Sequence, residues 1–154
     1  MNNGDKIIIG WQEIATLEDI NLPVIKVKID TGARTSSLHA ENIKYFKRRG
    51  KEYVSFEVHP IQRNKQITVK CNAEVFDKRH VTSSSGCKEY RPVIKTALKI
   101  GSYIWQIELN LTKRDYMGFR MLLGRNAMQG NIIIDPEHKF LHGIMSKKQL
   151  KGFY

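Results

Sequence analysis

The chain has 154 residues, of which 41% are hydrophobic and 27% are charged, a composition typical of soluble globular proteins. This length predicts a single domain over residues 1–154, and no apolar run is long enough to span a membrane. Lysine and arginine number 26 against 15 aspartates and glutamates, so the formal net charge is +11 at pH 7. Such a charge favours an acidic partner, namely nucleic acid, the ribosome or an acidic peptide.

The N-terminal residues and the cysteines indicate the compartment. Residues 1–6 do not have the pattern of a signal peptide. Cys71 and Cys87 are the only cysteines, and neither forms a C-x-x-C motif. We therefore expect a cytoplasmic protein with reduced cysteines and no membrane partner.

The first strongly patterned segment is residues 24–30. Ile25, Val27 and Ile29 alternate with polar residues, which predicts a half-buried strand that ends at Asp30. The strand leads into the turn Asp30-Thr31-Gly32-Ala33. Most Asp-Thr-Gly triplets are ordinary turns, so the triplet alone identifies no chemistry.

The rest of the chain reads as further short strands separated by turns. Gly101-Ser102 lies between two alternating runs and predicts a two-residue hairpin. Short helical turns are expected over residues 17–20 and 126–129. Alternating or apolar runs predict strands over residues 53–58, 67–71, 94–100, 103–111, 132–134 and 140–144. Several short strands of this kind indicate an all-β closed barrel or sandwich.

One hairpin of the expected β fold is strongly basic. It carries Lys44, Lys47, Arg48, Arg49 and Lys51. The run is either a solvated turn of a basic protein or a contact for an acidic partner. The sequence contains no RNP signature and no zinc-finger spacing that would identify a specific RNA-binding motif.

A second segment, Leu122-Leu123-Gly124-Arg125-Asn126, gives the Asp30 turn a functional interpretation. Together the two segments resemble the retropepsin-like aspartic proteases, in which an apolar strand enters Asp-Thr-Gly-Ala and a later apolar pair precedes Gly-Arg-Asn. A closer resemblance is to the bacterial branch labelled ATP-dependent zinc protease, which is found with ribosomal-protein glutamate ligases. Further matching segments are 83–86, 91–94 and 109–114, so the resemblance covers about Ile7 to Asp135.

This resemblance implies a fold and a reaction. The fold is a closed barrel of short strands with one short helix after Leu-Leu-Gly-Arg-Asn. The reaction is aspartic proteolysis, with Asp30, Thr31 and Gly32 as the catalytic turn. Two carboxylates must share a proton in that chemistry, and this chain holds one Asp-Thr-Gly. The resemblance therefore implies a homodimer in which each subunit contributes one Asp30 and Thr31 braces its symmetry mate.

The resemblance also suggests where substrate binds. An acidic residue commonly follows Asp-Thr-Gly-Ala in the viral members, whereas this chain has Arg34 there and retains Arg125. Two guanidinium groups at one turn indicate an anion site, for which a Glu-rich peptide is a natural ligand. Small residues over 79–91 match the hairpin flap of the family, although an ordinary surface loop has the same composition. The expected substrate-binding residues are Ala33, Arg34, Ser84, Ser85, Arg91 and Arg125.

The sequence gives little support for the zinc and the ATP dependence that appear in the label of the bacterial branch. The five histidines are scattered, and His138-x-x-x-His142 lacks the Glu of H-E-x-x-H. The sequence contains no G-x-x-x-x-G-K-[ST] loop. We expect no metal and no cofactor. Two alternatives to the aspartic endopeptidase stay open: a non-catalytic module that docks an acidic partner, and a zinc-dependent peptidase with an unfamiliar site.

Overall fold

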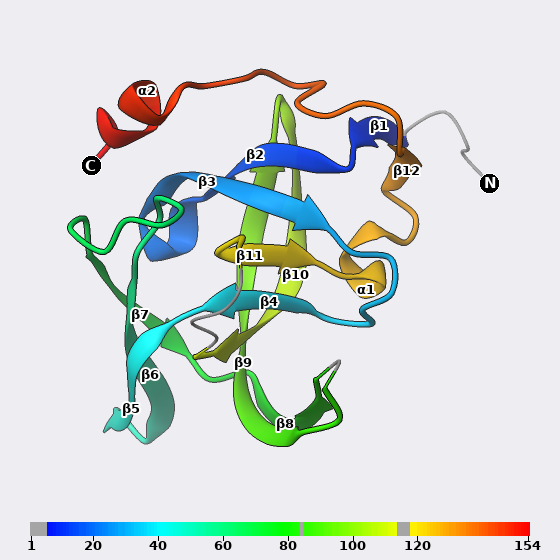
Figure 1. Ribbon diagram of the computed structural model, residues 1–154. Helices are drawn as coiled ribbons and strands as arrows, with labels where there is room; N and C mark the ends of the chain where they lie inside the picture. The colour runs from blue at the N-terminus through cyan, green and yellow to red at the C-terminus, as the bar shows by residue number, and fades with distance from the viewer. Residues whose placement is uncertain (1–5, 84, 114–117) are drawn as a thin grey trace.

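The structure, a computed structural model, describes residues 6–83, 85–113 and 118–154 and is mostly β (Figure 1). The strands are β1 (Ile7–Gly10), β2 (Gln12–Leu17), β3 (Leu22–Ile29), β4 (Ser36–His39), β5 (Glu41–Arg48), β6 (Lys51–Val58), β7 (Val69–Glu74), β8 (Asp77–Thr82), β9 (Lys88–Ile100), β10 (Tyr103–Thr112), β11 (Met121–Leu123) and β12 (Ile132–Asp135). The helices are a 3-10 turn η2 (Glu18–Ile20), α1 (Arg125–Met128) and α2 (Lys147–Lys151).

Six strands form a closed mixed barrel, which confirms the predicted fold class. Its order is β10-β4-β11-β3-β2-β9, and β9 pairs again with β10 to close it. The pairs β10–β4 and β11–β3 are parallel and the others are antiparallel. β8 extends the barrel sheet from β9, β5-β6-β7 form a separate antiparallel sheet, and β1 pairs with β12 in parallel.

The predicted alternation gives the barrel its core. Val27 and Leu38 point inward from β3 and β4, and both side chains are fully buried. Leu98 and Leu109 fill the interior from the long hairpin of β9 and β10. Each such side chain stabilises the fold by about 1.5–3 kcal/mol relative to leaving it exposed. The core therefore fixes the ends of β3 and β11, where the predicted signature segments lie.

Two predicted hairpins are confirmed. β9 and β10 meet at Gly101-Ser102, with Gly101 at φ +61. β5 and β6 pair across a turn at Arg49-Gly50, where both residues have positive φ. The predicted helical turns also appear, as η2 and α1. Cys71 and Cys87 are free thiols, and burial raises the pKa of Cys71 to about 12.

The predicted strand over residues 140–144 is wrong. The backbone N–H of Phe140 donates to the Gln12 carbonyl, but those of Leu141 and His142 donate to the Glu13 carboxylate. Glu13 is fully buried and also accepts from the Gly10 N–H. A buried side chain therefore takes the hydrogen bonds that a neighbouring strand would have supplied.

The C-terminal helix α2 was not predicted. Ser146 and Gln149 form a reciprocal capping box at its start, and Leu150 is its buried residue. Its short length left too little periodicity to detect. In the part of the chain that the structure describes, no helix has the length and apolar character needed to cross a membrane.

Candidate active site

The Asp30 turn is fixed by backbone hydrogen bonds at the end of β3. The Asp30 N–H donates to the Leu123 carbonyl over 2.9 Å, and the Ala33 N–H donates to the Asp30 carbonyl over 3.2 Å. The Gly32 N–H donates to Asp30 Oδ1 over 3.0 Å. The carboxylate is therefore held by its own turn, and one oxygen is oriented by a main-chain donor.

The second signature segment, Leu122-Leu123-Gly124-Arg125-Asn126, packs against this turn. β11 lies between β3 and β4, and the N–H groups of Arg125 and Asn126 donate to the carbonyls of Ala33 and Arg34. A Cβ atom on Gly124 would lie 2.5 Å from the backbone of Thr35. Gly124 therefore permits a close backbone approach. At Gly32, by contrast, the group nearest to an added Cβ atom would be the Asp30 carboxylate rather than a second backbone segment.

Arg34 and Arg125 both lie exposed at the turn. Arg125 Nη1 donates to the Thr31 carbonyl over 2.8 Å. Within residues 6–83, 85–113 and 118–154, no carboxylate lies within ion-pair distance of either guanidinium. Positive charge without a compensating carboxylate is available next to Asp30.

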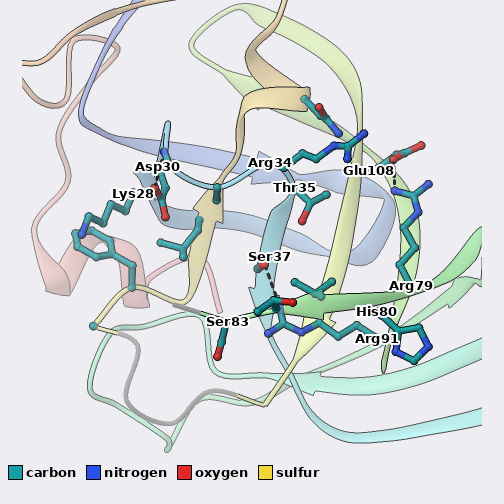
Figure 2. Close-up of a pocket in the computed structure, with 18 residues that line it drawn as sticks. Lys28, Asp30, Arg34, Thr35, Ser37, Arg79, His80, Ser83, Arg91 and Glu108 are labelled. Carbon is teal, nitrogen blue, oxygen red and sulfur yellow. Dashed lines mark hydrogen bonds and ion pairs between the residues drawn. The ribbon is translucent and has the colours of Figure 1, made fainter. Parts of the chain in front are cut away.

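A cavity of about 1130 Å³ opens beside Asp30 (Figure 2). Of the residues predicted to form the site, those that line the cavity are Asp30, Gly32, Ala33, Arg34 and Arg91. Thr31, Ser85 and Arg125 do not line it, and Ser84 lies outside the described residues. The predicted flap region forms the β8–β9 hairpin, whose Val81, Thr82 and Ser83 face the cavity.

Arg91 belongs to a buried polar network at this cavity. Its side chain is only 1% exposed. Its Nε donates to Glu89 Oε2 over 3.1 Å, and its Nη1 donates to Asn110 Oδ1 over 3.0 Å. Asn110 Oδ1 also accepts from the Ser37 hydroxyl over 2.9 Å. These contacts hold the guanidinium rigidly, because a buried charge is costly unless it is paired and hydrogen-bonded.

Sequence reasoning missed several polar residues of the cavity. Lys28 lies near Asp30, and Arg79, His80 and Glu108 lie on the other side (Figure 2). Arg79 Nη1 donates to Glu108 Oε2 over 2.7 Å, and hydrogen bonds to Glu108 and to Asp77 raise the pKa of Arg79. The sequence could have indicated Lys28, because it lies two residues before Asp30 in the same alternating strand and therefore on the same face. Nothing in the sequence placed Arg79 opposite Glu108.

Comparison with known proteins identifies the family. Residues 8–144 match the RimB-like family, described as the retropepsin-like aspartic endopeptidase RimB. The chain belongs to this family. A protein of unknown function (DUF785) from Legionella pneumophila has a solved structure with a TM-score of 0.72 and 34% identity, covering 88% of this chain and 97% of that one.

Longer relatives of this RimB-like chain carry another name. Proteins called probable alpha-L-glutamate ligase are 44% identical over 150 residues in Shewanella halifaxensis and 48% identical over 149 residues in Desulfotalea psychrophila. Each match covers 97% of this chain but only 33% and 32% of the relative, respectively. The chain therefore spans about one third of the length of these relatives.

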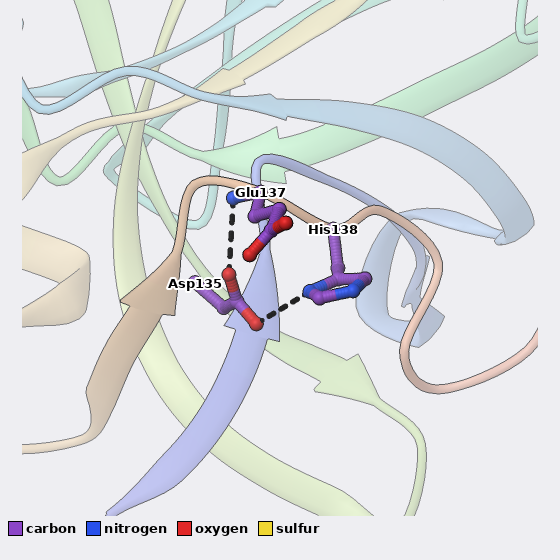
Figure 3. A group of neighbouring side chains, drawn as sticks. All are labelled: Asp135, Glu137 and His138. Atoms are coloured by element: carbon purple, nitrogen blue, oxygen red, sulfur yellow. Dashed lines mark hydrogen bonds and ion pairs between the residues drawn. The ribbon is translucent and has the colours of Figure 1, made fainter.

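A possible metal-binding group lies outside the cavity of this RimB-like chain. Among the described residues, Asp135, Glu137 and His138 bring ligand atoms within 4.8 Å of one another (Figure 3). His138 Nδ1 lies 2.7 Å from Asp135 Oδ2, and this hydrogen bond is the main cause that lowers the pKa of Asp135. The Glu137 N–H donates to Asp135 Oδ1. These hydrogen bonds stabilise a turn at the end of β12, which explains why the three side chains lie close together. None of the three residues lines the cavity.

Two of the scattered histidines meet at one half-buried glutamate, Glu41. His59 Nε2 lies 2.9 Å from Glu41 Oε2, and His39 Nε2 lies 3.7 Å from Glu41 Oε1. The hydrogen bond from His59 lowers the pKa of Glu41 to about 2. His59 also contacts the Thr68 hydroxyl, so the group ties the loop before β7 to β5. None of these residues lines the cavity, and their role is to stabilise the fold.

Proposed function

We propose that this chain acts as a homodimeric aspartic endopeptidase that cleaves acidic or glutamylated protein in the cytoplasm. The observation that carries the proposal is the placement of Asp30: the single Asp-Thr-Gly turn of a RimB-like chain, fixed by Leu123 and open to a cationic cavity. The proposal is finer than the family description, which names an aspartic endopeptidase without a substrate.

The chemistry requires two copies of Asp30. One carboxylate, ionised, removes a proton from water, while the other, protonated, donates a hydrogen bond to the scissile carbonyl. Like charges at close range do not both ionise at neutral pH, so the pair shares one proton. The hydrogen bond from the Gly32 N–H to Asp30 Oδ1 orients each carboxylate. Thr31 is exposed at the turn and is available to brace its symmetry mate.

The β1–β12 sheet supports a two-fold association. Ile8 and Ile133 are paired in register, and both side chains remain exposed, at 55% and 51%. Their neighbour Ile9 is buried, so Ile8 and Ile133 form the solvent face of this small sheet. Adjacent exposed isoleucines are typical of an interface, and a two-fold axis would bury them against their copies. The Ile29 N–H donates to the Trp11 carbonyl, which links this sheet to the catalytic turn.

The cavity supports an acidic substrate. Lys28 and Arg34 line it without a carboxylate at ion-pair distance in the described residues, and the buried Arg91 also lines it. The longer relatives are named as probable alpha-L-glutamate ligases, which supports a substrate that contains glutamate. We propose that such a ligase adds glutamate residues and that this domain removes them. Because the chain resembles the bacterial branch found with ribosomal-protein glutamate ligases, we propose that the ribosome carries the substrate.

The β8–β9 hairpin would close over the bound peptide. Val81, Thr82 and Ser83 face the cavity from this hairpin, and small residues follow at its tip. Closure would exclude bulk solvent from the Asp30 pair while the one attacking water molecule stays between the carboxylates. The substrate-binding set proposed is Ala33, Arg34, Ser84, Ser85, Arg91 and Arg125.

A mixing experiment tests the shared site. Wild-type chain and the Asp30→Asn variant are mixed in varying ratio, allowed to exchange subunits, and assayed on a fluorogenic Glu-rich peptide. If each active site needs Asp30 from both subunits, excess variant should depress activity well below simple dilution. Activity that falls only by dilution would argue against a shared site. A chain that stays monomeric and binds the peptide without cleaving it would instead favour the binding module.

A further inference from the structure

The solvent face of the β5-β6-β7 sheet carries a pair of stacked aromatic rings. Phe46 on β5 lies directly opposite Tyr53 on β6. Their ring centroids are 5.6 Å apart and the ring planes differ by 21°. The other face of the sheet packs on the core through Val54 and Phe56. Both rings are half-buried, so the pair lies on an open sheet surface rather than inside the protein.

Cations flank this aromatic pair on the same face. Side chains alternate along a strand, so Lys44 and Arg48 lie on the same side of β5 as Phe46. Lys51 lies opposite Arg48. Within residues 6–83, 85–113 and 118–154, no carboxylate is within ion-pair distance of Lys44 or Arg48. We call the face formed by Lys44, Phe46, Arg48, Lys51 and Tyr53 the platform.

The carboxylates on this face are already engaged at its far side. Glu74 on β7 lies 3.9 Å from Lys51 Nζ. Glu57 accepts a hydrogen bond from the Asn42 amide over 2.8 Å. Among the described residues, the ion pairs of the platform therefore involve Lys51, whereas Lys44 and Arg48 on β5 have no carboxylate at ion-pair distance.

We propose that the platform binds single-stranded nucleic acid. Flat aromatic side chains on a sheet stack on bases, and nearby cations neutralise the phosphates between them. The two stacked rings provide the contacts to the bases. Lys44 and Arg48 lie two residues before and after Phe46 on β5, where they can contact the phosphates of the nucleic acid. An acidic peptide would use the cations but leave the ring pair without a partner. The net charge of +11 increases the rate of encounter with a polyanion.

The platform is separate from the Asp30 cavity. None of its residues lines that cavity. Nucleic acid and a peptide substrate could therefore be bound at the same time. The proposal does not depend on peptidase activity, so its test is a binding measurement.

The test uses fluorescence anisotropy with labelled oligo-U and oligo-dT of about 12 nucleotides, within the roughly 4–16 nucleotides that a single such module covers. The double variant Lys44→Gln/Arg48→Gln should weaken binding at least about tenfold and reduce the salt slope by about 1.4. Phe46→Leu and Tyr53→Leu should each weaken binding about fivefold or more with the slope unchanged. The control Lys148→Gln/Lys151→Gln removes the same charge from exposed positions of α2, far from β5 in Figure 1, and should bind like wild type. The two oligonucleotides show whether RNA or DNA is preferred.

Any one of the following results would overturn the proposal. The first is no binding to either oligonucleotide at about 50 mM salt. The second is equal weakening by the platform and α2 double variants, which would mean attraction by net charge alone. The third is unchanged affinity in folded leucine variants, or tighter binding of a poly-glutamate peptide that is lost with Lys44 and Arg48. If a leucine variant fails to fold, the exposed-charge variants decide the matter.

Discussion

Gly124 lies so close to the backbone of Thr35 that a Cβ atom on Gly124 would be 2.5 Å from the Thr35 carbonyl. Real Cβ atoms do not approach backbone this closely, so no other residue fits without displacing the chain. Thr35 follows the Asp30 turn, and Leu123, the residue before Gly124, accepts the hydrogen bond from the Asp30 N–H. The position of Asp30 therefore depends on a backbone contact that requires glycine.

The variant Gly124→Ala should lose about 2–3 kcal/mol in free energy of unfolding, because the backbone of Thr35 must move to admit the methyl group. Chemical denaturation measures this loss. Gly118→Ala is the matched control, because, chain neighbours aside, no atom of residues 6–83, 85–113 and 118–154 lies within 4 Å of its added Cβ. Equal stability of the two variants would show that the contact at Thr35 is not tight.

The variant Asp30→Asn should reduce peptidase activity by at least about a hundredfold, because it removes the group that transfers the proton. Its thermal unfolding midpoint should remain the same or rise, since the asparagine keeps the shape and ends the repulsion between the two carboxylates of the proposed dimer. Activity assays and melting curves on the same preparation separate the two effects. Retained activity, on a substrate that the wild type cleaves, would remove Asp30 from the mechanism.

A chelator should leave the activity of the wild type unchanged. The carboxylates of the Asp30 pair need no metal ion to activate water. EDTA treatment followed by an activity assay provides the measurement, with zinc added back to the treated enzyme. Loss of activity that zinc restores would favour the metallopeptidase alternative.

In the variant Glu41→Gln, the free energy of unfolding should fall less steeply than in the wild type as the pH is lowered from 4.5 to about 2. His59 lowers the pKa of Glu41 from 4.5 to about 2 in the folded protein. A lowered pKa contributes stability that is present above the unfolded value of 4.5 and is lost as the pH falls to about 2. The contribution is at most about 3 kcal/mol. Urea denaturation between these pH values measures the loss, and wild type and variant should converge at the acid end. Parallel curves would show that the pair carries no pH dependence.

The strand that ends at Asp30 and the Leu-Leu-Gly-Arg-Asn segment could be predicted from the sequence, because the alternation before Asp30 is local and the two segments together carry the family resemblance. The alternation of Ile25, Val27 and Ile29 fixed the end of β3, and the Leu-Leu-Gly pattern marked β11. Contacts between distant segments could not be predicted. No pattern shows that buried Glu13 would take the N–H groups of residues 141 and 142, or that Arg79 would reach Glu108.

Short strands were also missed for a physical reason. β4 has four residues and all are buried, so it shows no alternation. β1 is just as short, and its partner β12 lies at the other end of the chain. Pairing of this kind is decided by tertiary packing rather than by local preference. Ser37, a polar residue of the cavity that lies on β4, therefore had no sequence signal.

The variant Arg34→Gln should lose a preference for glutamate in the substrate. Arg34 lines the cavity next to Asp30 and has no carboxylate at ion-pair distance among the described residues. A charge-assisted hydrogen bond contributes about 1.5–3 kcal/mol when water is partly excluded, so its loss weakens binding roughly ten- to a hundredfold. Affinities for Glu-rich and matched Gln-rich peptides are measured in wild type, in Arg34→Gln and in the control Lys148→Gln. The wild type and the control should prefer Glu, and this preference should weaken with salt. If the Arg34 variant keeps the full preference, or if the wild type binds both peptides alike, Arg34 does not recognise substrate charge.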